Sequence, residues 1–335
     1  MKIRFPKYPT RRVRSTALKL VSLAAAIVVV LICRLRDREA FQAYLDVFDC
    51  ADGYFAAYFV DVGQGDATLL AAPDGSYMLI DCGPTDQADY LVKYLNDIGV
   101  QKLDYFILTH PHEDHCGGAS EIIRNFPVEK FVIHADYLET FPYTRYIYQL
   151  GNNRFDEPTE IVGTRRDDRF IFADCAEFRI LSPEEVDADD ANESSLAIKI
   201  VYGNTSFLFT GDAEKGAERA MLANGYNLKA DVFSAGHHGS ATSNSPGFIE
   251  AVSPEFAVIS CGKDNSYGHP HKKTLETFAK YGVTVLRTDE LSNILLLSDG
   301  EEVWYFDENY AQTDGRPPEN SVLTGAAGAN EDLAA

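Results

Sequence analysis

Histidines in this chain are concentrated in three short motifs instead of being scattered along it. Seven of the eight histidines belong to these motifs, which hold His110, His112 and His115, then His237 and His238, and finally His269 and His271. The first motif follows the apolar segment 105–108, so its side chains would project from the loop at a strand end and converge. Imidazoles and carboxylates at this spacing suit Zn²⁺ or a similar divalent ion, and a lone nearby cysteine, Cys116, disfavours a structural thiolate site. The fold must therefore gather strand ends around a metal site.

Short apolar segments separated by turn residues predict a protein rich in β-strands. A helix is expected over residues 86–98, where Leu91, Leu95 and Ile98 lie at helical spacing, and another over residues 214–224. Strands are expected over residues 54–60, 67–72, 77–81, 103–108, 130–133, 169–172, 177–181, 195–202, 205–209, 231–234, 256–260, 283–287, 293–297 and 302–306. This succession predicts an α/β fold in which two sheets pack together and are covered by helices.

The first histidine motif matches the HxHxDH signature of the metallo-β-lactamase superfamily, with His110, His112, Asp114 and His115 in the signature positions. Further segments resemble, in the same order, the hydrolase domain of ComEC-type competence proteins. These segments are 59–67 (FVDVGQGDA), 79–83 (LIDCG), 209–213 (FTGDA), 236–240 (GHHGS) and 267–270 (YGHP). The resemblance covers about residues 54–300, and so many motifs in one order make a chance match implausible.

This resemblance implies a four-layer αββα sandwich with two divalent metal ions, zinc or manganese, at one edge of the sheets. The implied ligands are His110 and His112 for one ion, Asp114, His115 and His237 for the other, and Asp212 as a bridge between them. His238 is the substitute for His237. Two ions about 3.5–4 Å apart can activate a bridging water and stabilise charge on a phosphoryl oxygen, so the resemblance implies hydrolysis.

One departure from the superfamily pattern concerns the first ion. Many members supply another histidine shortly before the strand that leads to the bridging aspartate, whereas residues 189–195 read DDANESS here. Asn192 and Ser195 match the ComEC-like pattern instead. The first ion would then be under-coordinated, weakly held, or a metal other than zinc, such as manganese.

Three residues are candidates for a direct part in catalysis: Asp114, His238 and His269. His269 lies in a loop between glycine and proline, which suits a proton donor or a phosphate contact. A histidine that only packs the loop fits the same sequence. Asp81 is expected to support the site from behind by ordering the loops that carry the ligands.

The charge of the chain restricts its substrates. Residues 41–335 carry 20 Lys/Arg against 49 Asp/Glu, a net charge of −29, which opposes non-specific binding of nucleic acid. A phosphoester substrate, nucleic acid included, must therefore be attracted locally by bound cations. A phosphodiesterase outside the cell is the leading hypothesis. The alternatives are an esterase for small surface phosphoesters such as phosphocholine, and a non-catalytic binding module on the same fold. No protein partner can be inferred.

The N-terminal region predicts a single-pass membrane anchor. Its apolar run is long enough to span a bilayer when Lys19 reaches the interface, and the positive-inside rule places the basic start in the cytoplasm. A cleaved signal peptide is the alternative, because 24–26 (AAA) satisfies a cleavage rule. The chain would thus comprise a basic cytoplasmic segment at 1–15, a transmembrane anchor at 16–33, a linker at 34–53, an extracellular hydrolase domain at 54–307 and a disordered tail at 308–335.

Overall fold

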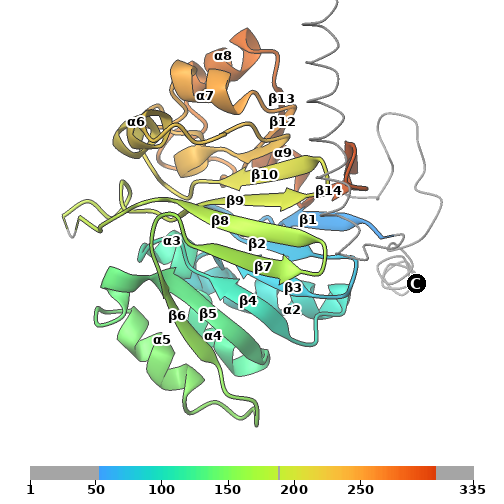
Figure 1. Cartoon of the computed structure of the whole chain (residues 1–335), viewed down its shortest axis with the longest axis vertical. Helices are drawn as coiled ribbons and strands as arrows, with labels where there is room; N and C mark the ends of the chain where they lie inside the picture. The colour runs from blue at the N-terminus through green and yellow to red at the C-terminus, as the bar shows by residue number, and fades with distance from the viewer. Residues whose placement is uncertain (1–52, 188, 307–335) are drawn as a thin grey trace, which may run out of the picture. The chain divides into compact units, whose positions relative to one another are not determined.

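The strands of this protein form two sheets (Figure 1). The computed structural model describes residues 53–187 and 189–306. The predicted cytoplasmic segment, membrane anchor and C-terminal tail therefore lie outside the described residues. Within the described ranges, no helix combines the length and the apolar character needed to cross a membrane. All described residues belong to one compact unit.

The first sheet has eight strands in the order β15-β14-β1-β2-β3-β4-β5-β6. They are β1 (Phe55–Phe59), β2 (Thr68–Ala71), β3 (Tyr77–Ile80), β4 (Leu103–Ile107), β5 (Val128–His134), β6 (Glu160–Thr164), β14 (Ile294–Ser298) and β15 (Val303–Phe306). Strands β3 to β6 are parallel, and the other neighbours are antiparallel. Because Ile80 pairs with Ile107, the segments that follow β3 and β4 leave the sheet side by side.

The second sheet has seven strands in the order β13-β12-β11-β10-β9-β8-β7. They are β7 (Arg169–Ala173), β8 (Ala176–Ser182), β9 (Ala197–Tyr202), β10 (Thr205–Phe209), β11 (Val232–Ser234), β12 (Phe256–Ile259) and β13 (Thr284–Arg287). Strands β10 to β13 are parallel, so the segments after β10 and β11 also leave at one edge. The N–H of Leu196 donates to the carbonyl of Thr109 at 3.0 Å and joins this edge to the end of β4.

Alternate side chains of the central strands are buried on both faces of each sheet. On β1, Phe55 and Phe59 lie between the sheets, whereas Tyr58 packs on the opposite face. The ring centroid of Phe55 lies 5.1 Å from that of Phe207, and the centroid of Phe59 lies 6.0 Å from that of Phe209. Each sheet therefore needs a further layer outside it.

Helices supply these outer layers and complete four layers (Figure 1). The first sheet is covered by α2 (Ala88–Ile98), α4 (Ala119–Asn125) and α5 (Tyr143–Leu150), and the second by α6 (Lys215–Ala223), α7 (Pro246–Val252) and α8 (Lys272–Lys280). Shorter helical segments are η1 (Thr85–Gln87), α3 (Glu113–Cys116), η2 (Ala135–Tyr137), η3 (Gly236–Gly239) and α9 (Thr288–Leu291). The predicted αββα sandwich is confirmed.

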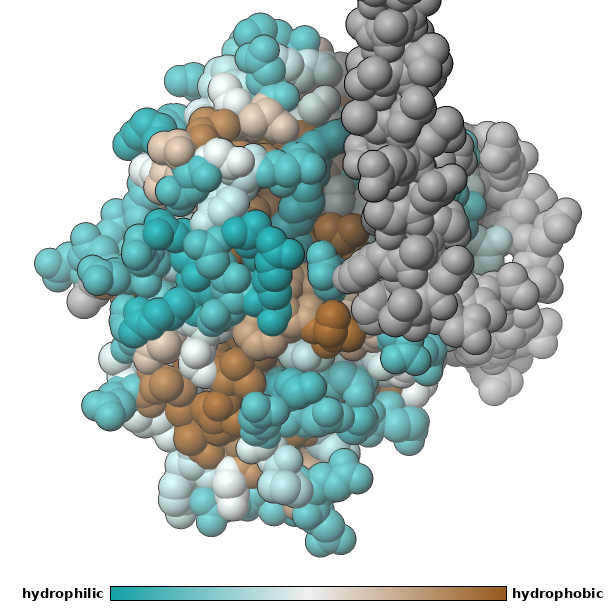
Figure 2. All heavy atoms as spheres, in the orientation of Figure 1, coloured by the Kyte–Doolittle hydropathy of each residue, from teal (hydrophilic) through white to brown (hydrophobic). Residues whose placement is uncertain are grey.

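Among the described residues, no helix covers the outer face of the second sheet at β7 and the start of β8, whereas α6 packs against the end of β8 (Figure 1). Figure 2 shows a hydrophilic surface there. Arg169, Arg179 and Lys199 lie directly opposite one another on three adjacent strands. Their strand neighbours Phe170 and Phe178 point to the core instead. This alternation of polar and apolar side chains allows that part of the sheet to face water without a helical cover.

Glu193 caps helix α6. Its carboxylate accepts the N–H groups of Gly216 at 2.7 Å and Ala217 at 2.6 Å, which have no partner within the helix. We expect Glu193→Ala to lower the free energy of unfolding by about 1 kcal/mol in urea denaturation. Glu157→Ala, at an exposed position, is the control and should change it by less than about 0.5 kcal/mol. Equal stability of the two variants would contradict this capping role.

Candidate metal centre

The loop after β4 carries the first histidine motif and ends in the short helix α3. His110 follows the strand, and His112 precedes α3, on which Asp114 and His115 lie. The ring centroid of His110 lies 4.7 Å from that of His112 and 4.2 Å from that of His115. His110 and His115 are buried, whereas His112 is exposed. The strand end thus brings three imidazoles together.

His110, His112 and Asp212 form a first cluster of possible ligand atoms. The Nε2 atom of His110 lies 3.0 Å from Nδ1 of His112 and 3.7 Å from Oδ2 of Asp212. Ligand atoms held about 2.1 Å from a tetrahedral ion are about 3.4 Å apart. The spacing therefore fits one small cation.

A second cluster surrounds the other oxygen of Asp212. Its Oδ1 atom lies 3.1 Å from Nε2 of His115 and 3.7 Å from Nε2 of His238, which in turn lies 3.3 Å from Oδ2 of Asp114. Among the described residues, these two Nε2 atoms and Oδ1 of Asp212 are buried and lack a hydrogen-bond partner. Unpaired buried polar atoms are costly, whereas one cation would satisfy all three. The residues therefore fit a divalent ion.

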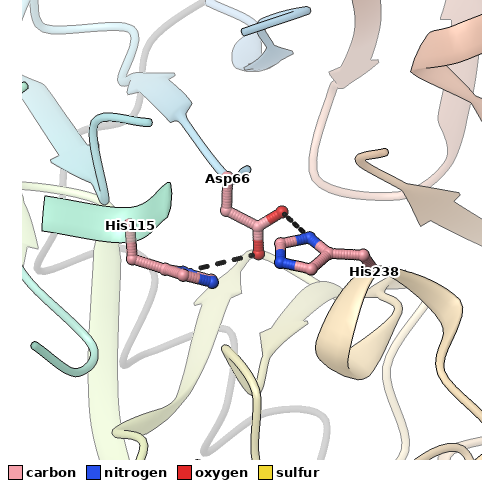
Figure 3. A group of neighbouring side chains, drawn as sticks. All are labelled: Asp66, His115 and His238. Atoms are coloured by element: carbon pink, nitrogen blue, oxygen red, sulfur yellow. Dashed lines mark ion pairs between the residues drawn. The ribbon is translucent and has the colours of Figure 1, made fainter. Parts of the chain in front are cut away.

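Asp66 faces His115 and His238 from their Nδ1 edges (Figure 3). Its oxygens lie 4.0 Å from Nδ1 of His115 and 3.5 Å from Nδ1 of His238, so these three residues could themselves hold an ion. However, each Nδ1 atom already has a partner, the carboxylate of Asp81 for His115 and the carbonyl of Ser260 for His238. An imidazole that donates from one nitrogen offers the other to a metal. The Nε2 atoms are therefore the better ligands, and Asp66 stabilises the rings from behind.

Asp81 links His115 to the end of β4 through hydrogen bonds. Its backbone is left-handed, with φ 55°, and its carboxylate accepts the N–H of Thr109 at 2.8 Å and the hydroxyl of Thr109 at 2.7 Å. The Nδ1–H of His115 donates to the same carboxylate at 2.8 Å. Burial raises the pKa of Asp81, although His115 and Thr109 oppose this shift. These contacts agree with the supporting role expected from the sequence.

His237 and His238 are adjacent in sequence but reach different oxygens of Asp212. The Nε2 atom of His237 lies 3.5 Å from Oδ2, the oxygen near His110, whereas His238 approaches Oδ1 and Asp114. The sequence placed His237 in the second cluster, with His238 as its substitute. In the structure His238 holds that position, because the backbone turn between the two residues separates their side chains.

Residues 60–263 match the family model described as the metallo-beta-lactamase superfamily. The chain belongs to this superfamily of metal-dependent hydrolases. Three curated relatives are ComEC-type competence proteins. ComE operon protein 3 of Bacillus subtilis is 33% identical over 267 residues, which are 75% of this chain and 34% of that protein. Competence protein ComA of Neisseria gonorrhoeae is 32% identical over 68% of this chain and 30% of its own length. The chain thus spans about a third of the length of these relatives.

Solved structures show the same fold. The metallo-beta-lactamase fold protein YhfI from Bacillus subtilis aligns with a TM-score of 0.50 at 12% identity, over 73% of this chain and 100% of that one. CmlA, a diiron beta-hydroxylase from Streptomyces venezuelae, aligns with a TM-score of 0.50 at 15% identity, over 72% and 54% of the two chains. At such identities the likeness concerns the fold alone, so the chemistry must be argued from the site.

Charges within this metallo-beta-lactamase site stabilise one another. Burial alone would raise the pKa of Asp212, but His115 and His238 hold it well below its ordinary value. Burial alone would lower the pKa of His238, but Asp212 and Asp66 raise it to about 10. A bound divalent ion would replace the protons on these imidazoles, because metal ligands must be deprotonated.

His269 lies beside both adjacent histidines. Its ring centroid is 5.6 Å from that of His237 and 6.1 Å from that of His238, and Tyr267 stacks on it at 5.6 Å. Burial, with the charges of His238 and His237, lowers the pKa of His269 to about 4. A neutral imidazole can donate a hydrogen bond to a phosphoryl oxygen but holds no extra proton. Of the two roles expected from the sequence, this favours phosphate contact over proton donation.

Two carboxylates of the site, Asp66 and Glu214, were not singled out in the sequence. Oε1 of Glu214 lies 3.3 Å from Nδ1 of His237. Asp66 had an available signal, because it follows the glycine of the GQG turn. A Cβ atom on Gly65 would lie only 2.4 Å from the carbonyl oxygen of Asp114. Because this turn packs closely against α3, the residue that follows it, Asp66, lies beside the candidate metal ligands.

Proposed function

We propose that this chain is a phosphodiesterase that uses two divalent metal ions, Zn²⁺ or Mn²⁺. The observation that best supports this is the position of Asp212, whose two oxygens each face a separate cluster of imidazoles. The proposed ligands are His110, His112 and Asp212 for the first ion, and Asp114, His115, Asp212 and His238 for the second. Ions bound by these residues would activate water for attack and stabilise charge on phosphoryl oxygens.

The remaining residues position this machinery. Asp81 holds the ring of His115 at its Nδ1 edge, and the carbonyl of Ser260, with Asp66 beside it, holds that of His238, which leaves the Nε2 atoms free to bind. Asp114 and His238, the candidates for catalysis, would act as ligands that fix the nucleophile. His269 would donate a hydrogen bond to the substrate. Together these groups form a preorganised site for an anionic substrate.

Phosphodiester chemistry is favoured over other hydrolyses by the likeness to ComEC-type hydrolase domains. The nearly complete set of ligands supports an enzyme over a binding module that only kept the fold. Nothing beyond the shared fold supports a lactam or a lactone substrate.

Small diesters should be cleaved at least as readily per bond as long double-stranded DNA. The reason is the net charge of −29 over residues 41–335, which repels a long polyanion everywhere except at the metal cluster. We would measure turnover of bis(p-nitrophenyl) phosphate and of linear DNA by the purified protein with Mn²⁺ or Zn²⁺. DNA cleavage should depend only weakly on salt, because few phosphates are neutralised by side chains.

Two results would count against this substrate ranking. A steep loss of DNA affinity between about 50 and 200 mM salt, without turnover of small diesters, would indicate a dedicated nuclease with a basic groove. A protein that binds two ions but cleaves no diester of any size would refute the proposed function itself.

A further inference from the structure

The first cluster has fewer imidazoles than the superfamily pattern supplies. The loop before β9 (Ala197–Tyr202) contains no histidine, and its contact with the site is made by Ser195, whose hydroxyl accepts the N–H of Asp212 at 3.1 Å. His110 and His112 are the two imidazoles of this cluster. Either the first ion has a ligand missing, or a residue from another element takes its place.

His237 comes from another element and approaches the same carboxylate oxygen. Its Nε2 atom lies 3.5 Å from Oδ2 of Asp212, and Nε2 of His110 lies 3.7 Å from that oxygen. Both distances are close to the roughly 3.4 Å expected between ligands of one tetrahedral ion. The N–H of His237 also donates to the carbonyl of Gly211 at 3.0 Å, which fixes its backbone beside Asp212.

Two groups flank the opposite nitrogen of His237, the carboxylate of Glu214 and the hydroxyl of Thr242. Oε1 of Glu214 lies 3.3 Å from Nδ1 of His237, and the hydroxyl of Thr242 lies 3.3 Å from the same atom. A carboxylate that accepts Nδ1–H fixes the tautomer in which Nε2 carries a lone pair. In the second cluster the carboxylate of Asp81 lies closer to its imidazole, 2.8 Å from Nδ1 of His115.

The backbone of η3 directs the two histidines apart. The backbone of His237 and His238 is left-handed, with φ 52° and 53°, a conformation that is unfavourable for residues other than glycine. Asn244 maintains this turn by accepting the N–H of Gly236 at 3.0 Å and donating to the carbonyl of Gly236 at 2.8 Å. Backbone strain of this kind persists where the surrounding structure enforces it, typically at functional sites.

We infer that His237 is a ligand of the first ion, in place of the histidine missing before β9, and that Glu214 orients it. Successive histidines of one strained turn would then serve different ions, His237 the first and His238 the second. This inference rests on the proposed two-metal site, and it adds a ligand from an element that the superfamily pattern does not use for this ion.

Metal content of single and double variants of the full chain tests this inference. After dialysis against Mn²⁺, we expect about two ions per wild-type chain and about one in His237→Ala. Loss of a second ligand from the same cluster should remove no further ion, so His112→Ala/His237→Ala should keep about one ion. His237→Ala/His238→Ala affects both clusters and should keep none. His269→Ala, which changes a neighbouring imidazole outside both clusters, should keep two.

Glu214→Ala should lower the affinity for the first ion about 10- to 100-fold, although the ion should still bind at saturating metal. Glu214→Gln should restore part of this lost affinity. Circular dichroism of each metal-free variant checks the fold. Two ions in His237→Ala, fewer than two in the wild type, or none in His112→Ala/His237→Ala would overturn the inference. The expected metal contents without any diester turnover would leave it standing and refute only the proposed phosphodiesterase activity.

Discussion

Asp212→Ala is expected to remove both metal ions and to lower hydrolysis by at least about a thousandfold, while the fold remains intact. The two oxygens of Asp212 face different clusters, so one truncation takes a ligand from each ion. Truncation also removes the negative charge that would compensate a cation bound among neutral, buried imidazoles. Metal analysis of the dialysed protein and turnover of a small diester are the measurements.

Two variants control for this result. Asp156→Ala changes an exposed aspartate in the loop between α5 and β6 and should keep both ions and full activity. Asp212→Asn preserves the size of the side chain and one carbonyl oxygen, so it should keep more metal than the alanine variant. Full metal content and full activity in Asp212→Ala would show that the two clusters do not form the binding site.

Most strands were predictable from sequence because the central strands of both sheets are buried on two faces. Continuous apolar segments such as β1 and β12 lie between a facing sheet and a helical layer, so nearly every side chain had to be apolar. Helix α2 was predicted because its apolar residues recur at helical spacing. The strand β6, at the edge of its sheet, was missed because it is only partly buried and so has no continuous apolar segment.

The short helices α4, α5, α7 and α8 were also missed. Helix α8 buries Thr274, Thr277 and Phe278, so two of its three buried residues are polar and give no apolar periodicity. Helices of seven to nine residues are not stable alone and form because they pack on a sheet. Such packing depends on contacts between distant segments, which a single sequence does not display.

The sequence indicated which candidate ligands lie close together better than it indicated how they are grouped. The HxHxDH motif lies on one loop and one short helix, so local spacing was enough to bring His110 and His115 together. For His237 and His238, the grouping depends on a left-handed turn that is held by Asn244. The sequence GHHGS alone does not specify that turn, because left-handed backbone is uncommon for residues other than glycine.

Asp81 provides the second large effect, because it joins the second cluster to the core. The carboxylate is 1% exposed and accepts from Thr109 and from His115. Asp81→Ala would leave these donors unpaired and place alanine in left-handed backbone. We expect it to lower the free energy of unfolding by about 3–5 kcal/mol and the affinity for the second ion about 10- to 100-fold. Urea denaturation and metal titration measure the two effects.

Asp81→Asn separates orientation of the imidazole from stability of the fold. Asparagine tolerates left-handed backbone, and its carbonyl oxygen can still accept the N–H of Thr109, so most of the stability should remain. Its amide would instead donate to Nδ1 of His115, which moves the imidazole proton to Nε2 and blocks the atom that faces Asp212. The asparagine variant should therefore be folded but hold its second ion at least about 10-fold more weakly. Wild-type affinity for both ions in this variant would show that Asp81 stabilises the strand end without selecting the tautomer of His115.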